Sequence, residues 1–165
     1  MKQKICILLI CVMLTLSGCN TLNTQGASSG SVKFYYLQNE IVYNSADSVV
    51  SYETRQSGRL KPEELIGQYL QGPEKKNLAS PYPEELKLVS VTQEDNTVKI
   101  VLSNEFTTLS NLELTLACSC LTKTMQGILP AESYEISSTG GKLNGKSSIL
   151  ITSNTFVWED TLPES

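Results

Sequence analysis

The sequence predicts a single α+β domain, with two helices on one face of a mostly antiparallel sheet. Three observations indicate this class. Two segments repeat apolar residues at spacings of three and four, as helices with one buried face do. Two alternating segments between them have the pattern of a hairpin, and further alternating segments come before and after. The order is a β-α-β-β-α-β core with extra short edge strands, and 165 residues suit one domain rather than two.

The first strand is predicted at residues 32–37 (VKFYYL), which are rich in β-branched and aromatic side chains. Alternation places Val32, Phe34 and Tyr36 on one face of this strand. Residues 41–43 and 48–53 have the composition of two further short strands around a polar turn. We expect these two to be the extra edge strands.

The first helix is predicted at residues 60–71. Pro62 suits a helix start, and two glutamates follow it in the first turn, where carboxylates favour the helix dipole. Its apolar stripe consists of Leu65, Ile66, Tyr69 and Leu70. Gly72 and Pro73 end the helix. Gly67 is either tolerated inside the helix or needed for close packing, and the sequence favours neither.

A proline-containing loop at residues 73–83 leads into the hairpin. Its strands are predicted at residues 86–92 and 98–102, with Leu86, Leu88 and Val98 among the inward residues and the turn at residues 94–97. Pro81, Tyr82 and Pro83 stiffen the loop, which is either a rigid lead-in to the strand or a binding tip.

The second helix is predicted to begin after an N-cap at Ser110 or Asn111, with Glu113 in its first turn. Its main apolar stripe consists of Leu114, Ala117, Cys118, Leu121, Met125 and Ile128. Cys118 is therefore expected in the core, and Cys120 on the flank. Strands are predicted at residues 133–137 and 147–151 around a glycine-rich turn, and residues 155–158 are a candidate extension of the sheet.

Residues 1–18 have the pattern of a bacterial lipoprotein signal peptide. Two lysines precede an apolar run at residues 5–16, which is shorter than the roughly 20 residues of a membrane span. The segment that follows, Leu16-Ser17-Gly18-Cys19, resembles the lipobox. The resemblance implies cleavage between Gly18 and Cys19 and a lipid on the Cys19 thiol. An ordinary signal peptide with a chance cysteine is the alternative.

This pattern divides the chain into four parts. The signal peptide at residues 1–18 precedes the lipidated cysteine and a flexible polar linker at residues 19–31. The folded domain occupies residues 32–158, and an acidic tail occupies residues 159–165. We therefore expect an extracytoplasmic protein that the lipid at Cys19 anchors to the cytoplasmic membrane.

Charge and composition exclude several kinds of function. The chain without residues 1–18 carries 11 basic and 17 acidic side chains, a formal charge of −6, which disfavours nucleic acid as a partner. It has no histidine, which excludes His-based catalytic triads and His-ligated zinc. Cys118 and Cys120 lie two apart on a helix and cannot readily bridge each other, so we expect free thiols rather than a redox pair. No cofactor and no metal are expected.

An ordered set of motifs resembles the GerMN domain of sporulation and spore-germination proteins. The motifs are the Gly72-Pro73 stop, the Leu-x-Ser-Pro-x-Pro loop at residues 78–83 with Ser80, Pro81 and Pro83, the Leu-x-Ser-Val strand at residues 88–91, the VKIVLS strand at residues 98–103, and the helix at residues 114–121. The match covers about residues 32–151. The resemblance implies a lipid-anchored envelope protein and brings no catalytic residues. A Leu-Pro-Gly common in the family is Leu129-Pro130-Ala131 here.

The leading functional hypothesis is a non-catalytic interaction module of the bacterial envelope, in a sporulation- or cell-wall-related assembly. Its expected partners are the membrane, envelope proteins and a second copy of the chain. The first alternative is a lipoprotein that binds cell-wall glycan or a small ligand, in a pocket lined by Tyr36, Tyr43, Tyr52 or Tyr134. A cell-wall enzyme would need paired carboxylates, for which Glu84-Glu85 and Glu94-Asp95 are the candidates.

Overall fold

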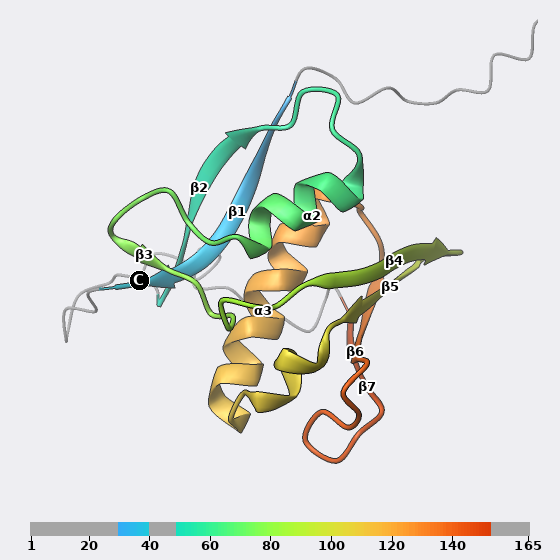
Figure 1. Cartoon of the computed structure of the whole chain (residues 1–165). Helices are drawn as coiled ribbons and strands as arrows, with labels where there is room; N and C mark the ends of the chain where they lie inside the picture. Colours follow the sequence, from blue (N-terminus) through green and yellow to red (C-terminus); the bar gives the residue numbers. More distant parts are fainter. Residues whose placement is uncertain (1–29, 40–48, 153–165) are drawn as a thin grey trace, which may run out of the picture.

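The computed structural model describes residues 30–39 and 49–152 (Figure 1). The predictions for the signal peptide, the lipobox with Gly18 and Cys19, the linker before residue 30, the strand at residues 41–43, the segment at residues 155–158 and the acidic tail lie outside these ranges. Within the described ranges, no helix is both long enough and apolar enough to cross a membrane.

Three strands form sheet A in the order β2-β1-β3: β1 (Ser31–Gln38), β2 (Val50–Gln56) and the short β3 (Leu78–Ala79). β1 pairs antiparallel with β2 along nearly its full length, with Phe34 opposite Glu53 and Tyr35 opposite Tyr52. β3 pairs with β1 only at the end of β1. One edge of β1 is therefore largely without a strand partner in sheet A.

Four strands form sheet B in the order β4-β5-β6-β7: β4 (Leu88–Glu94), β5 (Thr97–Leu102), β6 (Ser133–Ser138) and β7 (Ser148–Thr152). β4 and β5 form the predicted hairpin, with Asp95 at a φ of 51° in its turn. β5 and β6 run parallel, because the chain crosses over between them through the 3-10 helix η1 (Asn104–Thr108) and a long helix. β6 and β7 are antiparallel.

Both predicted helices are present. α2 (Pro62–Leu70) starts at the predicted proline, and the Glu64 carboxylate accepts the N–H of Lys61 at 2.7 Å. α3 (Asn111–Ile128) has its N-cap at Ser110, as predicted, and the Glu113 carboxylate accepts the Ser110 N–H at 2.9 Å in a capping box. The side chains of Leu65, Ile66, Tyr69 and Leu70 are buried, which confirms the stripe of the first helix.

The single α+β domain and the mostly antiparallel pairing are confirmed, but the strands form two sheets where one was expected. α3 lies between the sheets (Figure 1) and is buried on two sides. Leu121 and Met125 are fully buried, as predicted, but so are Cys120 and Thr124. The expectation of Cys120 on the flank was therefore wrong, because α3 contacts β1 on the side that the sequence pattern leaves outside.

Hydrogen bonds from the backbone of β1 to helix side chains explain why α3 is also buried on the side of sheet A. The N–H of Tyr35 faces away from β2 and donates to Thr124 Oγ1 at 3.0 Å, and the Tyr35 carbonyl accepts the Tyr69 hydroxyl at 2.8 Å. An unpaired backbone group in the interior costs about as much as a lost hydrogen bond. Side chains of α3 and α2 thus satisfy the edge of β1 that no strand covers.

The start of the hairpin also differs from the prediction. β4 begins at Leu88 rather than Leu86, because the Leu86 N–H donates to the Pro83 carbonyl at 3.1 Å in a turn. Leu86 is nevertheless buried, while Leu88 is half-buried at the border of the core. The strands at residues 98–102 and 133–137 are confirmed with small changes of their ends.

Gly67 and Gly72 give opposite predictions for substitution by alanine. A Cβ at Gly67 meets no atom within 4 Å, so the glycine is tolerated rather than required. We expect Gly67→Ala to raise the free energy of unfolding by about 1 kcal/mol, because alanine favours a helix interior. Gly72 has a φ of +96°, so Gly72→Ala should lower the free energy of unfolding by about 1–2 kcal/mol.

Chemical denaturation of the two variants beside the wild type measures this difference. Lower stability of Gly67→Ala would show that α2 needs the glycine for packing.

Candidate functional site

The Gly72-Pro73 motif ends α2 and turns the chain back toward sheet A. The N–H of Gly72 donates to the Tyr69 carbonyl at 3.1 Å, with Gly72 in the left-handed region that favours glycine. Pro73 follows with no N–H to continue the helix. The next two N–H groups, of Glu74 and Lys75, point at a single buried carboxylate.

That carboxylate belongs to Glu53 on β2, which is 3% exposed. It accepts the N–H groups of Glu74 and Lys75, both at 3.0 Å, and the Nε of Arg55 at 2.8 Å. Burial acts to raise the pKa of Glu53, but the bonds from Lys75, Arg55 and Glu74 outweigh it, and the net pKa is lowered. Arg55 also donates to the Gly72 carbonyl at 2.7 Å. This Glu53–Arg55 pair therefore fixes the family motif to sheet A.

The sequence analysis did not find this pair. Its only signal is two opposite charges two residues apart on one strand, which puts them on the same face. That spacing is also common on solvated strands, so the sequence alone does not show that the face is buried.

Hydrogen bonds within the loop and to the core fix the conformation of the Ser80–Pro83 loop. Ser80 Oγ accepts the N–H of Tyr82 at 3.1 Å, and Pro81 and Tyr82 are buried while Pro83 is half-buried. The Tyr82 hydroxyl donates to the Ala117 carbonyl on α3 at 3.0 Å. The central side chain of the loop thus packs into the core, as a rigid lead-in to the hairpin requires, and is not presented at a binding tip.

Tyr82 belongs to a network of buried tyrosines. Its hydroxyl lies 2.7 Å from that of Tyr69, whose carbonyl accepts the Tyr36 hydroxyl at 2.8 Å. Burial raises the pKa of all three phenols, so they stay neutral at physiological pH. The network joins sheet A, α2 and α3 through hydrogen bonds. Its phenols are structural donors and offer no general base.

The predicted tyrosine pocket does not form among the described residues. Tyr36 and Tyr134 are 0% exposed, and the Tyr134 hydroxyl donates to the Leu129 carbonyl at 3.1 Å. Tyr52 is 41% exposed on the outer face of sheet A, and Tyr43 lies outside the described residues. The tyrosines that were expected to line one site are therefore divided between the core and a surface.

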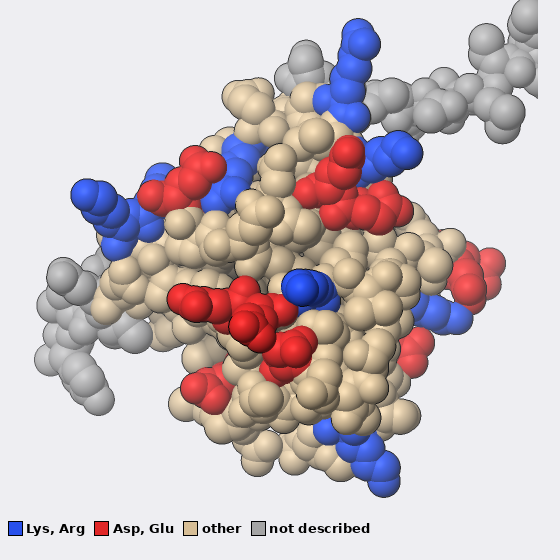
Figure 2. All heavy atoms as spheres, in the orientation of Figure 1, with Lys and Arg blue, Asp and Glu red and all other residues tan. Residues whose placement is uncertain are grey.

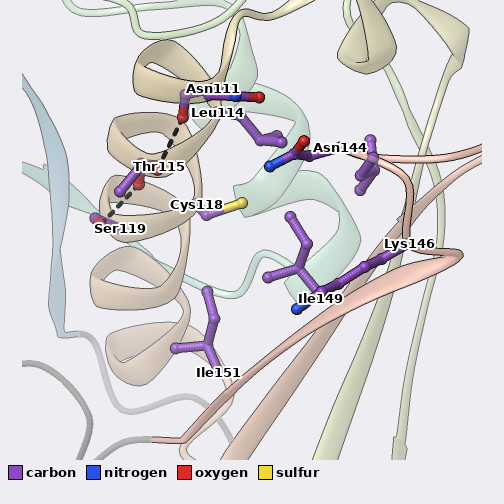
Figure 3. A pocket seen from close by; sticks show the side chains of 10 residues that line it. Asn111, Leu114, Thr115, Cys118, Ser119, Asn144, Lys146, Ile149 and Ile151 are labelled. Atoms are coloured by element: carbon purple, nitrogen blue, oxygen red, sulfur yellow. Dashed lines mark hydrogen bonds between the residues drawn. The ribbon is translucent and has the colours of Figure 1, made fainter.

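A cleft of about 250 Å³ separates α3 from the loop between β6 and β7 (Figure 3). Leu114, Leu143, Ile149 and Ile151 give it apolar walls, and the Cys118 sulfur points into it. Burial raises the pKa of Cys118 to about 12, so the thiol stays protonated and is a poor nucleophile. The hydroxyls of Ser119 and Thr115 donate to carbonyls of their own helix at 2.8 Å. The cleft can hold a small apolar group but has no activated nucleophile.

Cys118 and Cys120 are both free thiols, as expected. Burial also raises the pKa of Cys120 to about 12. Both thiols are therefore unsuited to exchange with an external disulfide.

The carboxylates considered as candidates for catalysis are exposed side chains of a turn and a hairpin. Glu84 and Glu85 are exposed beside a hollow of about 570 Å³ between α2 and β4, over which acidic side chains gather (Figure 2). Glu94 forms an ion pair with Lys99 at 2.5 Å, and Asp95 occupies the turn position. No group of three or more Cys, Asp or Glu side chains in the described ranges could hold a metal ion.

The Glu53–Arg55 pair gives a prediction about stability. Arg55→Met leaves the buried Glu53 carboxylate without its cation, and breaking a buried pair costs about 3 kcal/mol. Because the pKa of Glu53 is lowered in the fold, the stability it contributes is present above its unfolded pKa and is lost as the pH falls through its folded pKa. The loss in Arg55→Met should therefore be large at neutral pH and smaller in acid.

Denaturation of Arg55→Met and of Arg59→Met across this pH range measures the effect. Arg59 is exposed on the loop before α2 and serves as the control, for which no change is expected. Equal stability of the two variants at neutral pH would contradict the role given to the pair.

Comparison with known proteins places this fold. No curated protein matches the sequence. The solved tandem GerMN domains of the sporulation protein GerM from Bacillus subtilis align with 20% identity and a TM-score of 0.51, covering 82% of this chain and 48% of that one. A Clostridium perfringens protein, provisionally described as a lipoprotein, aligns with 20% identity and a TM-score of 0.45, covering 75% of this chain and 87% of that one.

The chain thus spans about half the length of the tandem GerM structure, and that similarity shows the shared fold alone. The sequence profile of the Germane family, described as sporulation and spore germination, matches residues 33–144. These residues include the Gly72-Pro73 turn, the Ser80–Pro83 loop and α3. The chain therefore belongs to the Germane family of sporulation and spore-germination domains.

Proposed function

We propose that this chain is a lipid-anchored, non-catalytic interaction module of the bacterial envelope, in a sporulation- or cell-wall-related assembly. The observation that carries the proposal is a Germane domain preceded by the segment Leu16-Ser17-Gly18-Cys19. Cleavage before Cys19 and acylation of its thiol attach the chain to the outer face of the cytoplasmic membrane. Two acyl chains make such an anchor stable, where one alone is marginal.

A non-catalytic role is supported by what the polar side chains of the domain already do. Glu53 and Arg55 hold the Gly72-Pro73 turn, and Ser80 holds the loop that follows. The tyrosine hydroxyls donate to backbone carbonyls. The thiols of Cys118 and Cys120 are protonated in the core. The family motifs therefore serve the fold, and contact with partners falls to the surface.

The linker sets how far the domain reaches from the membrane. The 11 residues between Cys19 and β1, most of them polar, span roughly 20 Å as a coil. The domain then contacts envelope proteins or a second copy of itself close to the membrane, and nucleic acid is not among its partners.

The cleft beside Cys118 supports one alternative, a lipoprotein that binds a small ligand. Its walls are apolar, which suits a small hydrophobic compound better than a glycan. Its volume of about 250 Å³ is below that of most ligand sites. We therefore keep the interaction module as the main proposal.

Substitution of Cys19 tests the anchor. We expect Cys19→Ala to abolish incorporation of labelled fatty acid and to prevent cleavage before residue 19, because the thiol is the acyl acceptor. Metabolic labelling, fractionation and mass spectrometry of the amino terminus measure both effects.

Cys11→Ala is the matched control, since it alters a cysteine of the same signal segment and should label like the wild type. Full labelling of Cys19→Ala in the membrane fraction would rule the lipid anchor out.

A further inference from the structure

The outer face of sheet A carries a cationic and aromatic surface. Val32, Phe34 and Tyr36 of β1 point into the core, so the residues between them point outward. We define the sheet A patch as the outward side chains and their neighbours from α3 and the loop after α2, namely Lys33, Tyr35, Tyr52, Lys75 and Lys123.

Contacts between these side chains hold the patch together. The rings of Tyr35 and Tyr52 pack with centroids 5.5 Å apart. Lys33 Nζ lies 4.2 Å above the Tyr52 ring, and Lys123 Nζ lies 5.7 Å from the Tyr35 ring. Lys75 Nζ donates to the Tyr52 carbonyl at 3.4 Å. Two ammonium groups thus lie against the two phenol rings, and the ammonium group of Lys75 lies at the backbone of β2 beside them.

Among the described residues, the acidic side chains next to Lys33 and Lys75 are engaged by Arg55. Glu53, the acidic residue of β1 and β2, faces the core and is neutralised by Arg55. Glu74, next to Lys75 in the chain, directs its carboxylate at Arg55, 3.6 Å from Nε. Acidic side chains gather instead around α2 and the start of β4 (Figure 2). The described part of sheet A therefore presents lysines on its outer face although the net charge of the chain is negative.

We propose that the sheet A patch binds the anionic phospholipid headgroups of the membrane that carries the chain. This rests on the proposed function, in which the chain is attached to that membrane at Cys19. Phosphate groups complement the lysines, and tyrosine rings favour the boundary between headgroups and acyl chains. With Lys33 above the Tyr52 ring, the patch suits an anion better than the flat stacking of a sugar.

The position of the patch in the chain favours a membrane over a soluble anion. β1 begins at Ser31, the last residue of the predicted linker, so Lys33 lies only 14 positions after Cys19. With only 11 residues between Cys19 and β1, this end of sheet A stays at high effective concentration near the bilayer. Each lysine at an anionic surface increases binding about fivefold, which is enough to orient a domain already held there. The acidic face around α2 and β4 then points away from the membrane.

The test follows acetylation of individual lysines in the full chain bound to vesicles. Vesicles of phosphatidylcholine are compared with vesicles that also contain about 30% phosphatidylglycerol, and bound protein is isolated by flotation. We expect Lys33, Lys75 and Lys123 to react at least about fivefold more slowly on the anionic vesicles. Lys142 and Lys146, on the loop between β6 and β7, should react equally on both. About 1 M salt should remove the difference by screening.

Two matched variants separate the patch from general charge. In Lys33→Gln/Lys75→Gln, the protection of Lys123 on anionic vesicles should fall several-fold. In Lys142→Gln/Lys146→Gln, which removes the same charge, it should stay. These lysines, apart from the half-buried Lys123, are exposed, so both variants should fold.

Several results would overturn the proposal. Equal acetylation on both vesicles would show no preference for anionic headgroups. Protection in the absence of vesicles would mean that an acidic protein surface covers the patch, such as residues 159–165 or a second copy. These results compare the same bound chain on two lipid compositions, so they leave the acylation of Cys19 to its own labelling experiment.

Discussion

The structure depends on one constraint, which is that α3 packs against both sheets and also bonds to the open edge of β1. Its Leu121 and Met125 are fully buried in the single hydrophobic core, and on the side of sheet A its Thr124 accepts the N–H that β1 leaves unpaired. The Tyr69 hydroxyl of α2 completes this edge by donating to the Tyr35 carbonyl. A strand edge without partners is a site of aggregation, and here helices cover it. The buried tyrosine network and the buried Cys120 follow from that arrangement.

The motifs of the Germane family connect the same elements, namely sheet A, α2 and α3. Arg55 of sheet A donates a hydrogen bond to the Gly72-Pro73 turn. The Tyr82 hydroxyl donates to a carbonyl of α3 and so fixes the loop that follows α2 to that helix. The bonds that these motifs make therefore hold the fold together. What differs between proteins of such a fold is expected on the surface. Here Lys33 lies on the outer face of sheet A, and Glu63, Glu84 and Glu85 line the hollow between α2 and β4.

Local signals in the sequence predicted most elements, and pairing over long distances was what they missed. The alternation of residues 32–37 identified the buried face of β1, and Ser110 with Glu113 located the start of α3. The division into two sheets depends on which strands pair, and Leu37 with Ala79 is a contact that no local pattern encodes. Cys120 was misplaced because the helical stripe shows one buried side, whereas α3 has two. The Glu53–Arg55 pair and the sheet A patch were missed for the same reason, since charged residues become a site only when distant segments meet.

The central claim is that this domain acts by binding other envelope components and not by catalysis. The most direct test is cross-linking of the full chain in its native membrane, followed by recovery through a carboxyl-terminal tag and identification of the products. The account predicts a defined set of envelope proteins or copies of the chain itself, recovered with the wild type and lost when the chain is not anchored. Recovery of wall fragments alone, or of nothing above the untagged control, would contradict it.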